Sequence, residues 1–200
     1  AFRLAELRNG MTTFSLPAPS SRAMALVRAG ALAGAALFLT TWVTGCSTPK
    51  DGTGIKLTTA DEVIVDKSKR RLRLVKDGKV MREYRVALGK DPVGHKFREG
   101  DQRTPEGDYV LDWRKHNSQY YKSIHVSYPN AVDRIRAQAA GYHPGGMIMI
   151  HGKPNHIQST AVLAEYDRID WTNGCIAVNN AEMDEIWHAV KDGTPIRILP

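Results

Sequence analysis

Residues 62–88 read EVIVDKSKRRLRLVKDGKVMREYRVAL, and this stretch decides the fold class of the chain. Apolar and polar side chains alternate in Glu62–Asp66 and again in Arg70–Lys76, which is the period of a half-buried strand. Asp77-Gly78 then provides the residues of a two-residue hairpin turn. We expect one face of the following strand to carry the alternate residues Val80, Arg82, Tyr84, Val86 and Leu88. The stretch therefore predicts a run of antiparallel strands.

Further strands and a helix are expected beyond this hairpin. Gly89–Gly107, with its glycines and prolines, predicts a loop. Alternation or short apolar runs predict strands at Tyr109–Trp113, Ile124–Tyr128, Met147–His151, Cys175–Val178 and Ile196–Leu199. A helix is expected over Ala131–Ala140, between a cap at Asn130 and an end at Gly141.

A second helix is expected near the end of the chain, after a cap at Asn180 or Asn179. Its apolar residues recur at the spacing of one helical face: Met183, Ile186, Trp187 and Val190. Many strands with two helices indicate a β-rich α+β domain over residues 57–200.

The composition is that of a globular protein with a core of ordinary size. The chain has 200 residues, 42% of them hydrophobic and 24% charged, which argues against a disordered or multi-span membrane protein. The net charge of +7 divides into a surplus of three in residues 1–45 and of four in the remainder. This mild basic excess does not support nucleic-acid binding. Two cysteines are too few for a disulfide framework or a Cys-rich zinc site.

Residues 1–45 have the pattern of a secretion signal. Ala29–Pro49 carries no charged side chain, is mostly apolar at its start and follows Arg28. The apolar part is short for a membrane span, so a cleaved signal is favoured over a retained anchor. Met11 and Met24 are both candidate initiators, and the residues before the true start would not be translated.

Val43-Thr44-Gly45-Cys46-Ser47 resembles the lipobox of bacterial lipoproteins. The resemblance implies cleavage before Cys46, acylation of that cysteine and a lipid anchor in the outer membrane facing the periplasm, with residues 46–56 as a tether. A thioether at Cys46 would leave Cys175 as the one thiol of an oxidising compartment. This context favours a working thiol at Cys175 over the ordinary alternative, a buried inert cysteine.

Two residues of the mature chain suggest a thiol–imidazole pair. Cys175 follows a glycine within Asp170–Asn179, which lets the backbone approach closely and aim the thiol outward. His151 ends a predicted strand and precedes Gly152. An imidazole beside a thiol lowers the pKa of the thiol and then protonates the leaving group. The sequence thus predicts a nucleophile and a base, provided that the fold brings Cys175 and His151 together.

His151-Gly152 and Thr172-Asn173-Gly174-Cys175-Ile176 together resemble the catalytic signature of the L,D-transpeptidases, the YkuD-type domain. Thr104-Pro105-Glu106-Gly107 also resembles a segment typical of that family, and the resemblance covers nearly all of the mature chain. Tyr121–Asn130 and the end of the chain are most similar to a short, murein-trimming proteobacterial branch. The resemblance implies a sandwich of mixed β-sheets with two or three helices.

The family resemblance implies a role for each matching position. It makes Cys175 the nucleophile, His151 the general base and acid, and the Gly152 carbonyl the group that orients the imidazole. The N–H groups of Gly174 and Cys175 would form the oxyanion hole. The thiolate would attack the L-centre carbonyl of a stem tetrapeptide and expel D-alanine, and an amine of a neighbouring stem would take the acyl group. The implied partners are peptidoglycan stem peptides and a murein-bound lipoprotein, with no metal or organic cofactor.

Thr172, Asn173, Tyr121 and Tyr128 are the expected substrate-binding residues, although aromatic residues on strands are more often part of a core. Asn173 stands where many family members have His, and Ala177 where many have Arg or Asn. Lys153–Asp170 is expected to form an extra loop. These departures leave the acyl acceptor open, so a murein amidase or carboxypeptidase is an alternative. A non-catalytic peptidoglycan-binding lipoprotein is the alternative from another class.

Two other clusters of side chains offer alternative functions. His143 and His156 could be combined with Cys175 into a zinc site, but their spacing fits no metal-ligand helix, and no metal is expected. The basic run is expected to be a solvated hairpin face, with contact to anionic peptidoglycan or phospholipid as the functional alternative. Its members are Lys67, Lys69, Arg70, Arg71 and Arg73.

Overall fold

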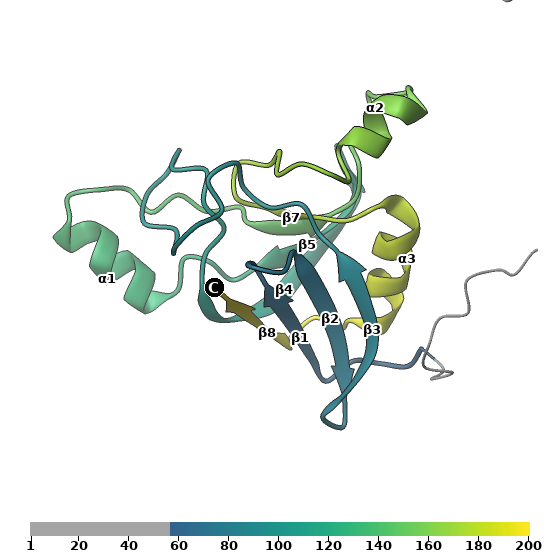
Figure 1. Cartoon of the computed structure of the whole chain (residues 1–200). Coiled ribbons are helices and arrows are strands. Elements are labelled where there is room, and N and C mark those ends of the chain that lie inside the picture. The colour runs from purple at the N-terminus through teal and green to yellow at the C-terminus, as the bar shows by residue number, and fades with distance from the viewer. Residues whose placement is uncertain (1–56) are drawn as a thin grey trace, which may run out of the picture. The chain divides into compact units, whose positions relative to one another are not determined.

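The computed structural model describes residues 57–200, and the predictions for residues 1–56, including lipidation of Cys46, lie outside this part of the chain. Eight strands form one mixed sheet in the order β3-β2-β1-β8-β4-β5-β6-β7 (Figure 1). The strands are β1 (Glu62–Asp66), β2 (Arg71–Lys76), β3 (Lys79–Arg85), β4 (Gly107–Ser118), β5 (Tyr121–Val126), β6 (Met149–His151), β7 (Ile176–Ala177) and β8 (Thr194–Leu199). Residues 57–200 also form three helices: α1 (Ala131–Ala139), α2 (Thr160–Glu165) and α3 (Asn180–Ala189). The predicted β-rich α+β class is confirmed.

The β2–β3 hairpin forms at the predicted turn, and the predicted face is buried at Tyr84, Val86 and Leu88 but not at Val80. Asp77-Gly78 has φ values of 50° and 71°, the positive values that a type I′ turn requires. Met81 is buried in the core, whereas Val80 is exposed. The pairing register shifts between Leu74 and Val75 and leaves Met81 as the extra residue of a β-bulge. The bulge moves the alternation by one residue, which the sequence pattern did not predict.

The far ends of the sheet are joined through the segment that follows β3. Ala87 and Ala177 exchange two backbone hydrogen bonds of 2.9 and 2.8 Å, and the Thr172 N–H donates to the Leu88 carbonyl at 3.1 Å. The predicted sandwich of sheets is therefore one hydrogen-bonded sheet of eight strands whose ends meet. This junction places residues 87–90 alongside both flanks of the turn that carries Cys175.

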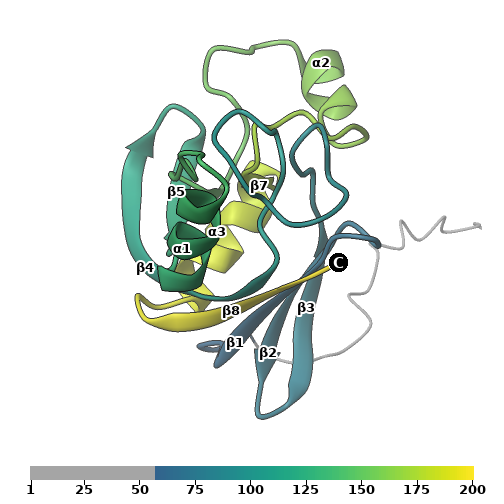
Figure 2. The same cartoon turned by 90° about the vertical axis from the view of Figure 1, so that its left-hand side faces the viewer.

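The last strand, β8, lies in the middle of the sheet. It runs parallel to β1 and antiparallel to β4, and Figure 2 shows it crossing below β4 and α1 towards β1. Its Ile196 and Ile198 are buried in the core together with apolar residues of both neighbouring strands. Helix α3 adds Met183 and Ile186 to the same core and packs against β5. The core therefore joins the N-terminal hairpin to the C-terminal part of the chain.

The two longer helices begin at capping boxes. The Asn130 side chain accepts from the Asp133 N–H at the start of α1, as predicted. At α3 the cap is Asn179, so the side chain of Asn180 is available for a different contact. Helix α2 lies in the predicted loop Lys153–Asp170 and buries none of its residues. No helix within residues 57–200 is long and apolar enough to cross a membrane.

Lys67 departs from the predicted solvated face of the hairpin. Its side chain is 2% exposed, and its ammonium group donates to Gly94 O, Thr104 O and Glu106 Oε1 at 2.6, 2.9 and 2.8 Å. These bonds fasten the Gly89–Gly107 loop to the end of β1. The other members of the basic run form ion pairs: Lys69 with Asp66, Arg70 with Asp170, and Arg71 and Arg73 with Glu83.

Candidate active site

Strand pairing brings the two predicted catalytic side chains to one face of the sheet. β6 and β7 are parallel neighbours, with His151 opposite Ala177. Paired residues of adjacent strands point to the same face, and so do residues two apart along one strand. Cys175 stands two residues before Ala177, so its side chain shares the face of His151. The fold thus places the Cys175 turn beside β6, the strand that ends at His151.

His151 is buried and held in one tautomer. Its side chain is 3% exposed, and Nδ1 lies 2.7 Å from the Gly152 carbonyl oxygen. A carbonyl only accepts, so Nδ1 carries the hydrogen and Nε2 is left with a free lone pair. Burial lowers the pKa of His151 to about 4. The imidazole is therefore neutral near pH 7 and able to take a proton at Nε2.

The two peptide units that flank Gly152 are each held by a hydrogen bond. The Gly152 N–H donates to the Tyr120 carbonyl at 3.0 Å, and the Lys153 N–H donates to Asn180 Oδ1 at 2.8 Å. A Cβ on Gly152 would lie 2.6 Å from Asn180 Oδ1 and 2.9 Å from Tyr121 Cβ, so only glycine fits. The predicted orienting carbonyl is thus itself oriented by Asn180. The sequence offered Asn180 only as a helix cap.

The turn before Cys175 is closed by its own side chains. The Thr172 hydroxyl donates to the Cys175 carbonyl at 2.7 Å and accepts from the Gly174 N–H at 3.1 Å. Gly174 has a φ of 125°, and a Cβ there would lie 2.6 Å from the Arg103 carbonyl oxygen. The Gly174 N–H, which is predicted to be part of an oxyanion hole, donates to the Thr172 hydroxyl in this structure. The Cys175 N–H has no acceptor among residues 57–200.

The thiol of Cys175 is half-buried and neutral at rest. Sγ lies 3.6 Å from the Met147 carbonyl oxygen, and no hydrogen bond joins it to His151 within the described chain. Burial raises the pKa of the Cys175 thiol. Burial thus disfavours the thiolate of Cys175 in the resting structure, as it disfavours the imidazolium of His151. Attack by the thiol must therefore be accompanied by proton transfer.

Two aromatic rings pack against the imidazole of His151. The Tyr120 ring centroid lies 4.6 Å from that of His151, and the Trp171 ring meets the imidazole edge-on at 5.5 Å. Tyr166, which caps the end of α2, lies 4.8 Å from Trp171. The extra segment Lys153–Asp170 thus contributes a ring to the shell that keeps water from the imidazole. The indole N–H of Trp171 is buried without an acceptor among the described residues.

The four predicted substrate-binding residues lie in different environments in the structure. Tyr128 is 2% exposed and donates its hydroxyl to the Pro144 carbonyl, so it is a core residue and not a groove residue. Tyr121 is partly buried, and its hydroxyl donates to the Asp184 carboxylate of α3. Thr172 is buried, and its hydroxyl makes the hydrogen bonds that close the turn before Cys175. Asn173 alone of the four is exposed next to Cys175. Within residues 57–200, no three His, Cys, Asp or Glu side chains gather as a metal site.

Comparison with known proteins gives one family and several relatives. Residues 60–198 match the YkuD family, described as the L,D-transpeptidase catalytic domain. YafK of Escherichia coli (strain K12) is 35% identical over 109 residues, which are 54% of this chain and 36% of YafK. YqjB of Bacillus subtilis (strain 168) is 27% identical over 140 residues, 68% of this chain and 69% of YqjB. Both relatives are classed provisionally as L,D-transpeptidases.

Solved structures similar to this chain in both fold and sequence include the helical cell shape determining protein Pgp2 from Campylobacter jejuni, with a TM-score of 0.51 and 26% sequence identity. The match covers 68% of this chain and 46% of Pgp2. The present chain therefore corresponds to less than half of Pgp2 and to about a third of YafK.

Proposed function

Since the chain belongs to the YkuD family of L,D-transpeptidase catalytic domains, we propose that it is a peptidoglycan-modifying enzyme with Cys175 as its nucleophile. The observation that carries the proposal is the parallel pairing of β6, which ends at His151, with β7, which begins directly after Cys175. The proposal is also supported by Nε2 of His151, which has a free lone pair because Nδ1 donates its hydrogen to the Gly152 carbonyl. Family membership indicates the reaction type, and the pairing of β6 with β7 supports a catalytic pair of Cys175 and His151.

In the proposed first step, Cys175 Sγ attacks the L-centre carbonyl of a stem tetrapeptide while its proton passes to His151 Nε2. The Cys175 N–H, which has no acceptor at rest, donates to the developing oxyanion. The imidazolium then gives its proton to the departing amine of D-alanine, and a thioester remains. An amine of a neighbouring stem attacks this thioester, His151 takes its proton, and the thiol is restored. Burial that keeps His151 neutral keeps it competent as a base.

Water is the second candidate acceptor, which would make the enzyme a carboxypeptidase or amidase. The supporting observation is at Ala177, where many family members carry Arg or Asn. Ala177 is buried, so no polar side chain stands at that point of β7. An acceptor amine therefore has fewer polar groups to hold it. Transfer to a murein-bound lipoprotein is a further variant of the same acyl-enzyme chemistry.

The site of action proposed for this chemistry is the periplasm, with the protein held to the outer membrane by a lipid on Cys46. The lipobox-like residues before and at Cys46 support this location. The name of Pgp2 describes a cell-shape determinant, and a role in the cell wall fits the proposed substrate. A non-catalytic wall-binding lipoprotein would share the location but not the dependence on Cys175.

Product analysis tests the proposal. The purified full chain and Cys175→Ala are incubated with peptidoglycan and tetrapeptide muropeptides, and the products are identified by mass spectrometry. Cys175-dependent loss of D-alanine with 3→3 dimers supports the transpeptidase. Shortened stems or new amines without dimers would favour water as acceptor. Equal products with both proteins, or none with either, would contradict the enzyme proposal.

A further inference from the structure

A cavity of about 390 Å3 lies beside the Cys175 turn. Its lining includes Asn173, two residues before the cysteine, and Gly146, which precedes Met147. The Met147 carbonyl oxygen is the atom that lies 3.6 Å from Sγ. Both sides of the cavity therefore belong to the segments that hold the thiol. Lys96 also lines the cavity, and it is the residue of interest.

Lys96 is a buried cation with one unused hydrogen-bond donor. Its side chain is 3% exposed, and Nζ donates to Asp101 Oδ1 at 2.6 Å and to the Arg98 carbonyl at 3.0 Å. An ammonium group has three N–H donors, and no other residue in 57–200 accepts the third. Lys67 is a useful contrast, because its three donors have three acceptors. Every N–H of the Lys67 ammonium group therefore has an acceptor, whereas one N–H of Lys96 has none among residues 57–200.

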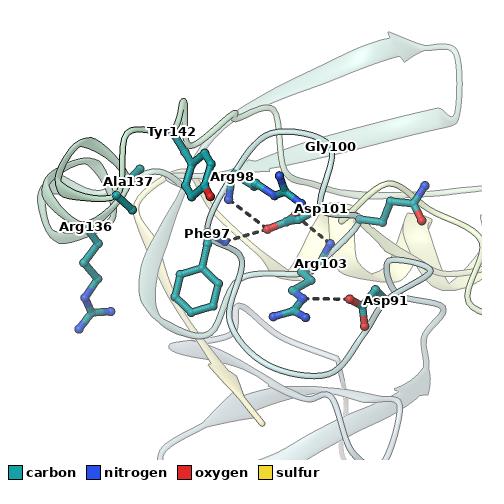
Figure 3. Close-up of a pocket in the computed structure, with 11 residues that line it drawn as sticks. Asp91, Phe97, Arg98, Gly100, Asp101, Arg103, Arg136, Ala137 and Tyr142 are labelled. Atoms are coloured by element: carbon teal, nitrogen blue, oxygen red, sulfur yellow. Dashed lines mark hydrogen bonds and ion pairs between the residues drawn. The ribbon is translucent and has the colours of Figure 1, made fainter.

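Lys96 forms an ion pair with Asp101, and its third N–H has no acceptor among residues 57–200. The Asp101 carboxylate also accepts from the backbone N–H groups of Phe97, Arg98 and Arg103, as Figure 3 shows. These bonds share the carboxylate among four donors. The other acidic side chain of the cavity, Glu99, is exposed and lies 3.1 Å from His143. A buried ammonium with a free donor favours an anionic ligand in the cavity.

Electrostatics indicates that Lys96 and the thiol are close enough to interact. Burial raises the pKa of Cys175, and the positive charge of Lys96 opposes this effect. The larger cavity of Figure 3, about 560 Å3, shares Gly100 and Gln102 with the smaller one but is lined by neither Lys96 nor Asn173. The smaller cavity is therefore the one that combines a buried cation, Lys96, with a residue of the turn that carries Cys175, Asn173.

We propose that Lys96 binds the terminal carboxylate of the stem peptide that Cys175 attacks. The inference rests on the proposed function and specifies how the substrate is recognised. In a tetrapeptide stem the scissile carbonyl and the terminal carboxylate are separated by the single D-alanine residue that leaves. A carboxylate in the cavity would accept the third N–H of Lys96 while the preceding carbonyl lies at Sγ. Recognition of the free carboxylate then selects the last peptide bond of the stem.

The test compares two substrates and three proteins. A tetrapeptide stem and its C-terminal carboxamide are given to the wild-type chain, Lys96→Met and Lys69→Met, and D-alanine or D-alaninamide release is measured. Losing a hydrogen bond between charged groups should lower kcat/KM of Lys96→Met for the carboxylate by about tenfold to a hundredfold. The carboxamide should be a poor substrate for all three proteins. Lys69→Met, which removes an exposed lysine outside the cavity, should keep the wild-type preference.

A binding measurement separates this inference from the proposed function. The tetrapeptide and its carboxamide are titrated calorimetrically into Cys175→Ala with and without Lys96→Met, after thermal unfolding has shown both proteins to be folded. Tighter binding of the carboxylate that disappears with Lys96→Met supports the carboxylate site, even if the wild-type chain turns over neither peptide. An undiminished preference for the carboxylate in folded Lys96→Met, in turnover or in binding, would overturn it.

Discussion

Burial sets the resting state of the two reactive residues. His151 is enclosed by protein and by the Tyr120 and Trp171 rings, and the pKa of the imidazole falls to about 4. The pKa of the Cys175 thiol rises for the same reason. Desolvation disfavours the charged form of each group, so the pair is a thiol and a neutral imidazole at pH 7. The enzyme would create the thiolate only when substrate is present to receive it.

This resting state predicts slow alkylation of Cys175 by iodoacetamide at neutral pH. Thiolate is the reactive form, and a raised pKa leaves less of it at pH 7 than in a free cysteine. The alkylation rate should be below that of N-acetylcysteine at pH 7 and should keep rising as the pH passes 9. Intact-mass measurements from pH 6 to 10 give these rates. A fast rate that is level around pH 7 would instead show a thiolate–imidazolium pair at rest.

At the scale of the elements, helix α3 supports the active site through its first residue. Asn179 caps the helix, and Asn180 uses its side chain to hold the Lys153 N–H. The carbonyl of the same peptide unit accepts from His151 Nδ1. Asn180 is therefore a positioning residue for the imidazole, although it does not touch it.

Asn180→Ala should lower kcat by about tenfold, because one hydrogen bond that fixes the orienting carbonyl is lost. Asn180→Asp keeps an acceptor at this position and should recover most of the rate. The matched control is Asn179→Ala, which removes the cap and should cost about 1 kcal/mol of unfolding free energy with little change in kcat. Chemical denaturation gives the unfolding free energy of the three variants, and steady-state kinetics gives their kcat. Equal kcat in Asn180→Ala and Asn179→Ala would contradict the positioning role.

The sequence predicted the features of the fold that depend only on neighbouring residues. Asp77-Gly78 supplied a hairpin turn, and Asn130 supplied a helix cap, because each acts on residues within one turn. The bulge at Met81 was missed, since it depends on how β3 meets β2 across the hairpin. Tyr128 was misplaced for a related reason. Alternation along a strand says which residues share a face, but not which face the rest of the molecule covers.

At the scale of the whole molecule, distant segments complete the sheet and the site. β8 comes last in the chain but separates β1 from β4. Residues 87–90 close the far ends of the sheet against the flanks of the Cys175 turn. The two motif residues could be found from sequence, whereas the unused donor of Lys96 and the occupied N–H of Gly174 could not. Both depend on which segments meet in three dimensions.

The central place of β8 predicts a large effect of truncating its buried face. Ile196→Ala should lower the unfolding free energy by about 2–5 kcal/mol, because it leaves a void where β1, β8 and β4 meet. Leu199→Ala lies on the exposed face of the same strand and should cost clearly less. Urea unfolding followed by tryptophan fluorescence compares the two. Similar losses in both variants would show that β8 does not pack as described.

The acyl-enzyme is the most direct test of the central claim, that Cys175 attacks the stem peptide with His151 as its base. The purified chain is mixed with tetrapeptide muropeptide, quenched in acid after short times, and examined by intact-protein and peptide mass spectrometry. The account predicts a mass increase equal to the stem without its D-alanine, located on Cys175, absent in Cys175→Ala and strongly reduced in His151→Ala. D-Alanine release by a folded Cys175→Ala protein, or turnover of the wild-type chain with the adduct on another residue, would contradict it.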